Sequence, residues 1–252
     1  MLRLNVIYYG QPSPETDSRI IGVRPQYLVC NPPHGLYGEM NGYEGDMLMR
    51  DLDTYRANGI KMIGYLTGGY EGTMSGGGLG PEWYSLELNR KLVRNMALED
   101  RVDGVFIDEC SAFPDSESRK YLSALTTEAH QLGLTTWGNT GADEFDPWFL
   151  EKGGFDLMNS TEDWQGGELS RVQHQWGSRV SVTGFKRWYT PEDAFRLTVD
   201  AWNKGLACCY ITSEEYVSLA PWFEEYARML REHLSRKPRR NWYSRLFGSG
   251  RS

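Results

Sequence analysis

Eight strand-like runs alternate with helix-like segments along this chain, and the alternation limits the folds that it can adopt. Each run is short, rich in branched and aromatic residues, and bounded by turn-forming residues. Eight strands, each followed by a helix within about 230 residues, are typical of a single (β/α)₈ TIM barrel, an α/β fold. The runs span residues 4–10, 26–33, 60–69, 103–109, 134–141, 155–163, 180–185 and 206–216.

The segments between the runs carry helix signals. Residues 46–59 have apolar side chains at helical spacing and end at Gly59, a residue that readily takes the left-handed conformation of a helix end. Residues 190–205 begin with Thr190 as N-cap and Pro191 at the first helical position. Both segments are therefore predicted to be helices.

An open, doubly wound sheet is the alternative fold, but it often carries a glycine-rich phosphate loop after its first strand. Here that place is taken by GQPSPETDS, which is no such loop. The glycines of residues 70–80 follow the third run and lack the lysine of a P-loop. We therefore expect one barrel domain over residues 1–234, followed by a short, basic and disordered tail, residues 235–252.

Charge is unevenly distributed between these two parts. The tail holds six basic and no acidic residues, so residues 1–234 carry 21 basic and 34 acidic side chains, a net charge of −13. A body this acidic repels nucleic acid and tolerates cationic ligands. We therefore expect no nucleic-acid partner, and the sequence does not indicate an oligomeric state.

No segment approaches the roughly 20 apolar residues of a membrane-spanning helix. The first residues, MLRLNVIYYG, also lack the long apolar stretch of a signal peptide. The sequence as it stands predicts a cytoplasmic protein, or a secreted one if an export signal has been removed.

The four cysteines are Cys30, Cys110, Cys208 and Cys209. They form no CxxC motif and no cluster with histidine, which argues against a structural zinc site. We expect buried free thiols, and a Cys30–Cys110 disulfide stays open as an alternative.

Polar and aromatic side chains gather where the strand-like runs end. In a (β/α)₈ barrel the active site lies at the C-terminal ends of the strands. Acidic residues stand at two of these ends, with Asp108 and Glu109 after the fourth run and Glu162 after the sixth. The further residues expected to contact a ligand there are Tyr8, Asn31, His34, Tyr65, Thr67, Tyr70, Asn139, Asp163, Trp164, Tyr210 and Glu214.

This combination of side chains suits a carbohydrate. Two carboxylates that flank a glycosidic bond supply the acid and the nucleophile or base of a glycosidase. Aromatic faces can stack on sugar rings, while amides and tyrosine hydroxyls can bind the sugar hydroxyls. We therefore expect a polysaccharide or oligosaccharide partner, with neither a cofactor nor a metal.

The Asp108–Glu109 doublet does not hold two equivalent groups if the strand stays extended. Successive side chains of a strand point to opposite faces, so Asp108 shares a face with Phe106 while Glu109 points away with Ile107. We expect one acid to act on the substrate. The other would orient it, anchor a loop or shift its pKa through like-charge proximity.

Six motifs occur in order along residues 4–230: NPPHG, IGYLTGGY, DGVFIDECS, WGNTG, MNSTED and YITSEEYVSLAPWFEEY. Together they resemble the spherulin-4-like family of (β/α)₈ glycoside hydrolases, which is related to endo-α-1,4-N-acetylgalactosaminidases. The DGVFIDECS motif is the most specific part of the resemblance. The DGxDxDxE motif of chitinases does not fit, because Phe106 takes the place of one of its acids and Cys110 the place of its final glutamate.

The resemblance implies endo-acting, retaining hydrolysis of polymers of α-1,4-linked N-acetylgalactosamine or galactosamine, such as galactosaminogalactan. Carried over by position, it implies Asp108 as nucleophile, Glu162 as acid/base and Glu109 in a supporting role. The carboxyl groups of Asp108 and Glu162 should then lie about 5–5.5 Å apart. The acidic body agrees with a partly deacetylated, cationic amino-sugar substrate.

Two alternative functions stay open at the level of sequence. Asp108, Glu109, Glu162 and Asp163 could hold Mg²⁺ in a metal-assisted hydrolase, since Mg²⁺ prefers oxygen ligands. The chain could also be a carbohydrate-binding barrel without catalytic activity. Sensitivity to a chelator would distinguish the first alternative, and binding without turnover the second.

Overall fold

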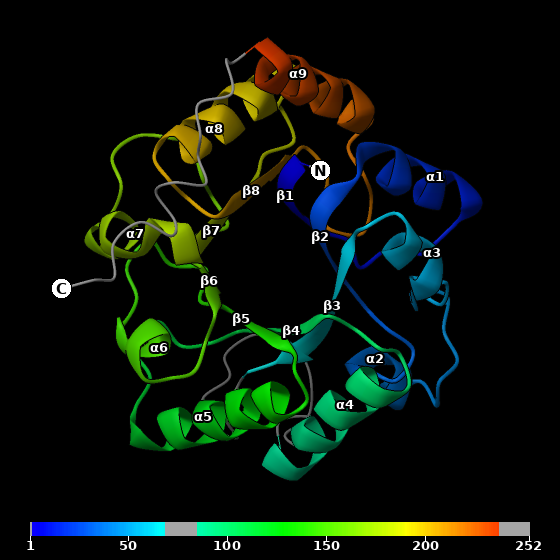
Figure 1. Ribbon diagram of the computed structural model, residues 1–252, viewed down its shortest axis with the longest axis vertical. Coiled ribbons are helices and arrows are strands. Elements are labelled where there is room, and N and C mark those ends of the chain that lie inside the picture. Colours follow the sequence, from blue (N-terminus) through cyan, green and yellow to red (C-terminus); the bar gives the residue numbers. More distant parts are fainter. Residues whose placement is uncertain (1, 69–84, 237–252) are drawn as a thin grey trace, which may run out of the picture.

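The fold was obtained as a computed structural model that describes residues 2–68 and 85–236. Within them, parallel strands form a single eight-stranded sheet in the order β1 to β8. Strand β1 lies beside β8, so the sheet curls into a nearly closed barrel surrounded by helices (Figure 1). The (β/α)₈ prediction is therefore confirmed.

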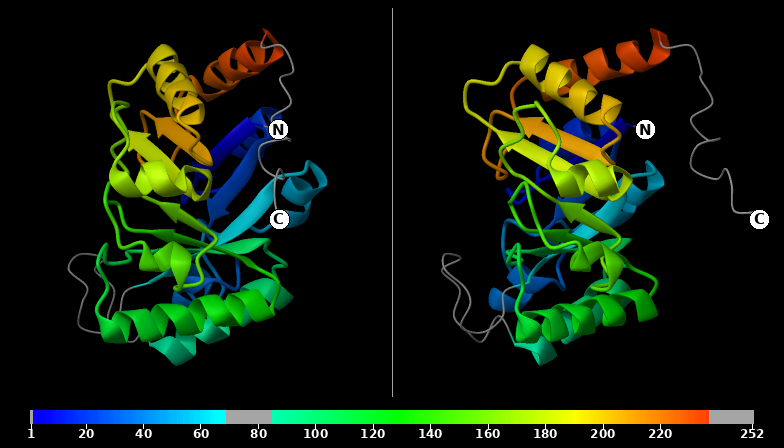
Figure 2. Two further views of the ribbon diagram at one scale, coloured as in Figure 1. Left: turned by 60° about the vertical axis from the view of Figure 1, so that its left-hand side comes forward. Right: turned by 90° about the vertical axis from the view of Figure 1, so that its left-hand side faces the viewer.

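Each of the eight predicted runs overlaps one strand, although several strands are shorter than the runs and β1 and β2 begin before them. The strands point the same way along the barrel, away from the end at which the chain starts (Figure 2). Their bounds are β1 Leu2–Ile7, β2 Pro25–Cys30, β3 Lys61–Thr67, β4 Gly104–Asp108, β5 Thr135–Asn139, β6 Leu157–Asn159, β7 Val180–Phe185 and β8 Cys208–Thr212.

The helices cover the outside of the barrel. Thr190 caps α8 as predicted, with its hydroxyl accepting the Asp193 N–H and the Asp193 carboxylate accepting the Thr190 N–H. The helix bounds are α1 Pro14–Val23, α2 Leu36–Met40, α3 Leu52–Ala57, α4 Leu86–Leu98, α5 Ser116–Gln131, α6 Trp148–Glu151, α7 Arg171–Trp176, α8 Pro191–Asn203 and α9 Phe223–Arg236, with a short 3₁₀ helix at Gly177–Arg179.

The predicted helix over residues 46–59 is wrong in its first half. Helix α3 begins only at Leu52, because Asp51 acts as its N-cap. The Asp51 carboxylate accepts hydrogen bonds from the N–H and the hydroxyl of Thr54. A side chain that binds the backbone in this way favours a helix start over a helix interior.

The four cysteines are buried free thiols, so a Cys30–Cys110 disulfide is not formed. Residues 237–252, most of the predicted basic tail, lie outside the described residues, while Ser235 and Arg236 belong to α9. No helix in the described ranges is long and apolar enough to cross a membrane.

Aromatic side chains fill the barrel interior below the C-terminal ends of the strands. Tyr27 of β2 and Trp137 of β5 meet edge to face with ring centroids 5.1 Å apart, and Phe106 of β4 adds a second contact at 6.0 Å. Strands β2 and β5 are not neighbours in the sheet, so this contact must cross the interior. Alternation along β4 then places Asp108 on the inward face, two residues above Phe106.

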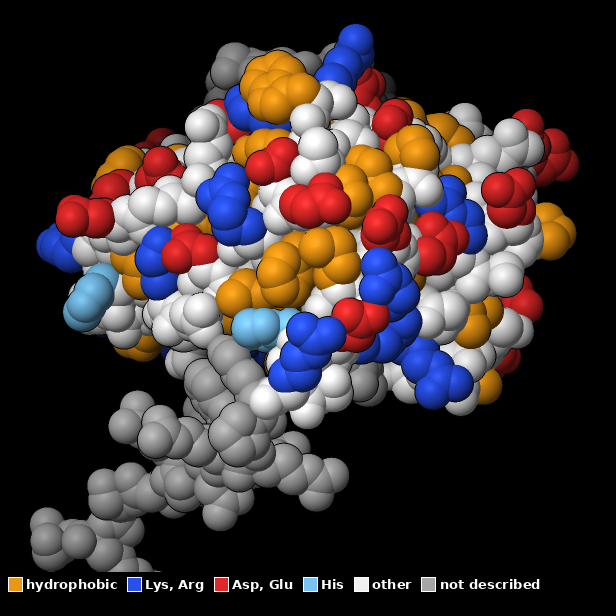
Figure 3. Space-filling view, turned by 90° about the horizontal axis from the view of Figure 1, so that it is seen from above, with side chains coloured by type: hydrophobic (Ala, Val, Ile, Leu, Met, Phe, Trp, Pro, Cys, Tyr) orange, Lys and Arg blue, Asp and Glu red, His pale blue; other side chains and the backbone are white. Residues whose placement is uncertain are grey.

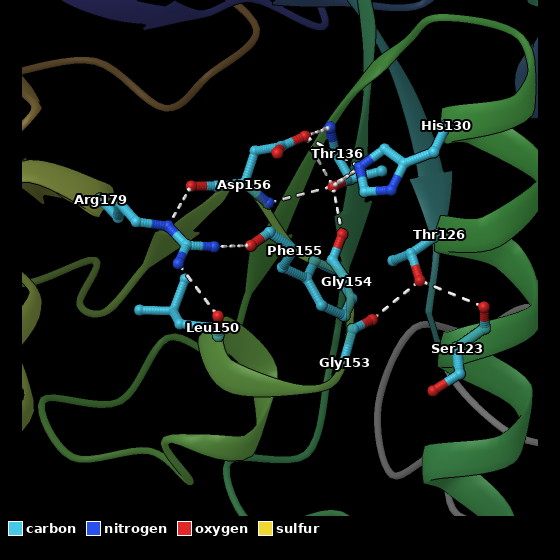
Figure 4. A network of polar contacts seen from close by, with 10 residues as sticks. All are labelled: Ser123, Thr126, His130, Thr136, Leu150, Gly153, Gly154, Phe155, Asp156 and Arg179. Atoms are coloured by element: carbon cyan, nitrogen blue, oxygen red, sulfur yellow. Dashed lines mark hydrogen bonds and ion pairs between the residues drawn. The ribbon is translucent and has the colours of Figure 1, made fainter. Parts of the chain in front are cut away.

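The end of the barrel opposite the expected active site is held by a polar network (Figure 4). The Asp156 carboxylate accepts the Thr136 N–H, and the Thr136 hydroxyl donates to the Gly154 carbonyl. The Arg179 side chain donates to three backbone carbonyls, of Leu150, Phe155 and Asp156. One side chain therefore ties α6 to the loop that leads into β6.

Replacing Arg179 with alanine is expected to lower the free energy of unfolding by about 2–4 kcal/mol, because three carbonyls lose a charged donor. Arg179→Lys should restore only part of the loss, since an ammonium group lacks the planar fork of a guanidinium. Denaturant unfolding followed by tryptophan fluorescence would measure both changes.

The matched control is Arg228→Ala on the surface of α9. This outer side of the barrel, over α8 and α9, interleaves acidic and basic side chains around a hydrophobic strip (Figure 3). Arg228 pairs there with Glu225 and Glu232 in exposed contacts, which are worth about 0–1 kcal/mol. Equal losses in the two alanine variants would contradict the role given to Arg179.

Candidate active site

The Asp108 carboxylate stands at the C-terminal end of β4 and is only partly exposed. Its Oδ1 accepts the backbone N–H of Glu109 at 2.8 Å and the side-chain amide of Asn139 at 2.6 Å. The Tyr65 hydroxyl of β3 also donates to this carboxylate. Three donors from three adjacent segments of chain therefore converge on one acid.

One nitrogen atom links Asp108 to Glu162. The Asn139 Nδ2 that donates to Asp108 also donates to Glu162 Oε1, at 2.7 Å. The two carboxylate oxygens therefore lie no further apart than the sum of these bonds, about 5.3 Å. Retaining glycosidases hold their carboxyl groups about 5–5.5 Å apart, and inverting ones about 6.5–9.5 Å.

Two hydrogen bonds to Oδ1 fix the orientation of the Asn139 side-chain amide. Its Oδ1 accepts the Gly141 N–H at 3.1 Å and the Asn159 side-chain amide at 3.0 Å. Ser181 donates to Asn159, and the Trp137 indole donates in turn to Ser181. Because both bonds to Oδ1 come from donors, the amide must present its own two N–H groups to the acids.

Tyrosine rings surround the two acids. Tyr9, just beyond β1, lies edge to face with Tyr65 at 5.0 Å and with Tyr216 at 6.4 Å. Tyr37 adds a tilted contact with Tyr65 at 5.8 Å. Burial, together with the nearby charges of Asp108 and Glu162, raises the pKa of Tyr9 and Tyr216, so both hydroxyls stay protonated and can donate hydrogen bonds.

The protein raises the pKa of both acids, for different reasons. Burial raises the pKa of Asp108, and the bonds from Asn139, Glu109 and Tyr65 oppose the rise. Glu162 stands at the mouth of the barrel, where loss of water and the charge of Asp108 raise its pKa, opposed only by Asn139. Asp108 therefore receives three hydrogen bonds that favour its anion, whereas Glu162 receives only the one from Asn139.

Glu109 does not simply continue the strand. Its φ of 59° lies in the left-handed region, so the chain turns directly after Asp108. Gly68, directly after β3, lies against this turn, and its N–H donates to the Asp108 carbonyl at 2.6 Å. A Cβ on Gly68 would stand 2.8 Å from that carbonyl oxygen, too close for any other residue without a shift.

Of the predicted ligand contacts, Tyr65 and Asn139 lie directly against the acids. Thr67 pairs in register with Asp108, and Asn31 follows the end of β2. Both are buried, and the Thr67 hydroxyl and the Asn31 amide have no hydrogen-bond partner among the described residues. Tyr70 lies outside the described residues.

Four predicted residues have contacts elsewhere. Tyr8 donates to the Gln11 carbonyl, His34 binds the buried Asp100 carboxylate, and Tyr210 packs on Phe223 of α9. The Trp164 indole donates to the Leu197 carbonyl of α8 and so lies behind the barrel wall.

The two remaining predicted residues occupy the rim. The Asp163 carboxylate pairs with Lys186 at 2.8 Å and is half exposed. Glu214 accepts a bond from the Ser218 hydroxyl at 3.4 Å. Both acids are therefore engaged with neighbours on the rim rather than with the Asp108–Glu162 pair.

Four residues of the site, Tyr9, Tyr37, Tyr216 and Asn159, are absent from the ligand contacts predicted from the sequence. The sequence does hold one signal for Tyr9, because Asn5 is a polar residue in the middle of β1. Asn5 pairs in register with Tyr27, whose ring faces the interior, so residues of the same parity point inward. That parity selects Tyr9 over Tyr8.

The described residues contain no group of three or more His, Cys, Asp or Glu side chains arranged to hold a metal ion. The expected Mg²⁺ ligand Asp163 is instead paired with a lysine. The arrangement of acids is therefore that of a bridged pair rather than of a metal-binding cluster.

The sequence matches no protein-family model and has no significant match among curated proteins. Solved structures do resemble it. Sph3 of Aspergillus clavatus, in complex with GalNAc, aligns with a TM-score of 0.60 at 16% identity over 91% of this chain and 97% of that one. A chitinase from Chromobacterium violaceum aligns with a TM-score of 0.56 at 10% identity over 93% and 100%.

A chitinase-like agglutinin from Robinia pseudoacacia also aligns with a TM-score of 0.56, at 11% identity over 91% of this chain and 100% of its own. At such low identities these likenesses show the barrel fold. The chemistry must therefore be argued from the side chains, because one barrel fold supports many activities.

Proposed function

We propose that this barrel is a glycoside hydrolase that cleaves α-1,4-linked galactosamine or N-acetylgalactosamine polymers internally and with retention. The observation that carries the proposal is the shared Asn139 nitrogen, which holds the Asp108 and Glu162 oxygens within about 5.3 Å of each other. A separation of this size is typical of direct attack by one carboxylate and is shorter than the separation of about 6.5–9.5 Å typical of an inverting enzyme.

The local donors support distinct roles for the two acids. Asp108 is assigned as nucleophile, because three donors stabilise its anion. Glu162 is assigned as acid/base, because its pKa is raised by loss of water and by the charge of Asp108. Different surroundings for two carboxylates are how glycosidases distinguish acid from nucleophile.

The chemistry proceeds in two steps. Asp108 Oδ2 attacks the anomeric carbon, the bond to the leaving sugar breaks, and Glu162 gives its proton to the departing oxygen. Glu162 then takes a proton from water, whose oxygen attacks the anomeric carbon and releases the Asp108 carboxylate. Two inversions at the same carbon retain its configuration.

The resemblance in sequence motifs and the likeness to Sph3, whose structure contains GalNAc, support the choice of sugar. The tyrosine rings around the acids support a carbohydrate ligand in general. Asn31 and Thr67, with unpartnered polar atoms, fit a role in binding the sugar's hydroxyl groups.

Incubation with the α-1,4-linked polymer is expected to release oligosaccharides of mixed length, with the α-anomer appearing first in proton NMR spectra. EDTA should leave the rate unchanged. First appearance of the β-anomer would contradict retention, and loss of activity with EDTA would favour the metal-assisted alternative. Binding without any product would favour a non-catalytic barrel.

A further inference from the structure

Glu109 has an unusual environment for a carboxylate next to a nucleophile. Its Oε2 is buried and has no hydrogen-bond partner in the described part of the chain. Its backbone is in the left-handed region, with φ 59°, and its N–H is bound to Asp108 Oδ1. A residue other than glycine held in this conformation, with a buried carboxyl oxygen left unpaired, carries a cost that points to function.

The described residues around Glu109 provide negative charge and no cation paired with it. Among the described residues, Asp108, Glu109 and Glu162 take part in no ion pair. The basic residue on this rim that lies beside Asp163, Lys186, is already paired.

The position of Glu109 relative to the reacting carbon is set by Asp108. If Asp108 attacks C1 of a hexosamine, the nitrogen on C2 is only two bonds away from that carbon. Glu109 directly follows Asp108, and its charge acts on Tyr37 and Tyr65, whose rings lie beside the site. The carboxylate therefore lies near enough to Asp108, Tyr37 and Tyr65 for its charge to act on them.

We propose that Glu109 is a specificity-determining residue that binds the 2-ammonium group of a deacetylated galactosamine unit, an inference that rests on the proposed function. A cationic amine would satisfy both the missing hydrogen bond and the uncompensated charge. A neutral acetamide would satisfy only the hydrogen bond. The preferred unit next to the cleaved bond is therefore the deacetylated sugar.

The test compares kcat/KM on fully deacetylated and fully N-acetylated α-1,4-linked oligomers. The wild-type protein is expected to prefer the deacetylated oligomer, and Glu109→Gln should reduce that preference at least about tenfold, since a buried charge pair is lost. The wild-type preference should also fall as the pH is raised through the pKa of the sugar amine, while that of Glu109→Gln stays flat.

Glu215→Gln is the matched control, because Glu215 is an exposed acid on the same rim that pairs with Arg187. It should keep the wild-type preference. Equal slowing of both oligomers by Glu109→Gln would overturn the inference, as would a wild-type preference for the acetylated oligomer.

Calorimetric binding of the deacetylated oligomer separates this inference from the proposed function. Tighter binding to the wild-type protein than to Glu109→Gln, in a protein that cleaves neither oligomer, would overturn the hydrolase proposal and support the role of Glu109. Cleavage of the polymer with equal binding to both proteins would support the hydrolase and overturn the role of Glu109.

Discussion

Replacing Asp108 with asparagine is expected to lower kcat on the α-1,4-linked polymer by on the order of 10³-fold or more, which corresponds to about 4 kcal/mol. An amide has nearly the same shape as the carboxylate, and its oxygen can still accept the bonds from Glu109 and Asn139. The variant should therefore fold normally and bind the sugar, but it lacks the anionic oxygen that forms the covalent intermediate. Reducing-end release measures the loss, and thermal unfolding checks the fold.

The matched control is Asp103→Asn, at the opposite end of the same strand. The Asp103 carboxylate accepts the Met62 N–H at 2.8 Å, so it supports the structure far from the site. We expect this variant to lose stability and to keep its kcat/KM. A similar kcat for Asp108→Asn and the wild-type protein would remove Asp108 from the mechanism.

A second variant tests the nucleophile directly. Asp108→Ala leaves space beside the anomeric carbon, which azide can enter in place of the lost carboxylate. With an aryl α-glycoside, azide should restore activity and give a glycosyl azide of β-configuration, because only one inversion then occurs. Absence of this product at high azide concentration would argue against a covalent intermediate on Asp108.

The alternation of strands and helices and the pair of site carboxylates can be predicted from the sequence alone. Asp108 and Glu162 can be paired from their positions in the chain, because residues at the C-terminal ends of parallel strands share one rim. The inward direction of Asp108 follows from its parity with Phe106, a side chain that packs against Trp137.

Other features depend on contacts that the local pattern does not contain. Trp164 turns away from the rim because its N–H pairs with the Thr183 carbonyl, next to a bridge between Asp163 and Gly184. The register of β1 shifts between Leu2 and Asn5, so the direction of Leu2 does not indicate that of the later residues of the strand. The left-handed backbone conformation of Glu109 also cannot be predicted from the sequence, since glutamate rarely adopts it.

Asn139 combines a feature that the sequence predicts with one that depends on tertiary contacts. Its place at the end of β5 is predictable from the sequence, but its role as a bridge is not. That role requires the register that sets Asn139 beside Asn159, together with the Gly141 N–H that fixes the amide. Such a network is set by the packing of three strands rather than by one segment.

Replacing Glu162 with glutamine is expected to lower kcat on the polymer by about 10²–10⁴-fold, the usual contribution of a general acid. Glutamine keeps an oxygen that can accept the Asn139 bond, so the bridge survives while the transferable proton is lost. An aryl glycoside with a good leaving group needs little protonation. Bond cleavage with that substrate should therefore be slowed far less than with the polymer.

The pH dependence gives the sharpest test of this role. The active wild-type state needs Asp108 ionised and Glu162 protonated, so the rate falls as pH drops through the pKa of the first and as pH rises through that of the second. Loss of water and the charge of Asp108 raise the pKa of Glu162, which moves the upper limit of activity towards neutral pH. In Glu162→Gln that upper limit should disappear.

Glu168→Gln, an exposed acid on the same loop, is the control and should keep the wild-type profile on both sides. Asp108 and Glu162 are hydrogen-bonded to the same Asn139 amide, so the two pH limits of the wild-type activity belong to the pair. Only the change of a limit on substitution assigns that limit to one residue. Loss of the upper limit in Glu162→Gln alone would identify Glu162 as the proton donor. Its persistence would transfer that role to another acid of the rim, with Glu109 the nearest one in the chain to the nucleophile.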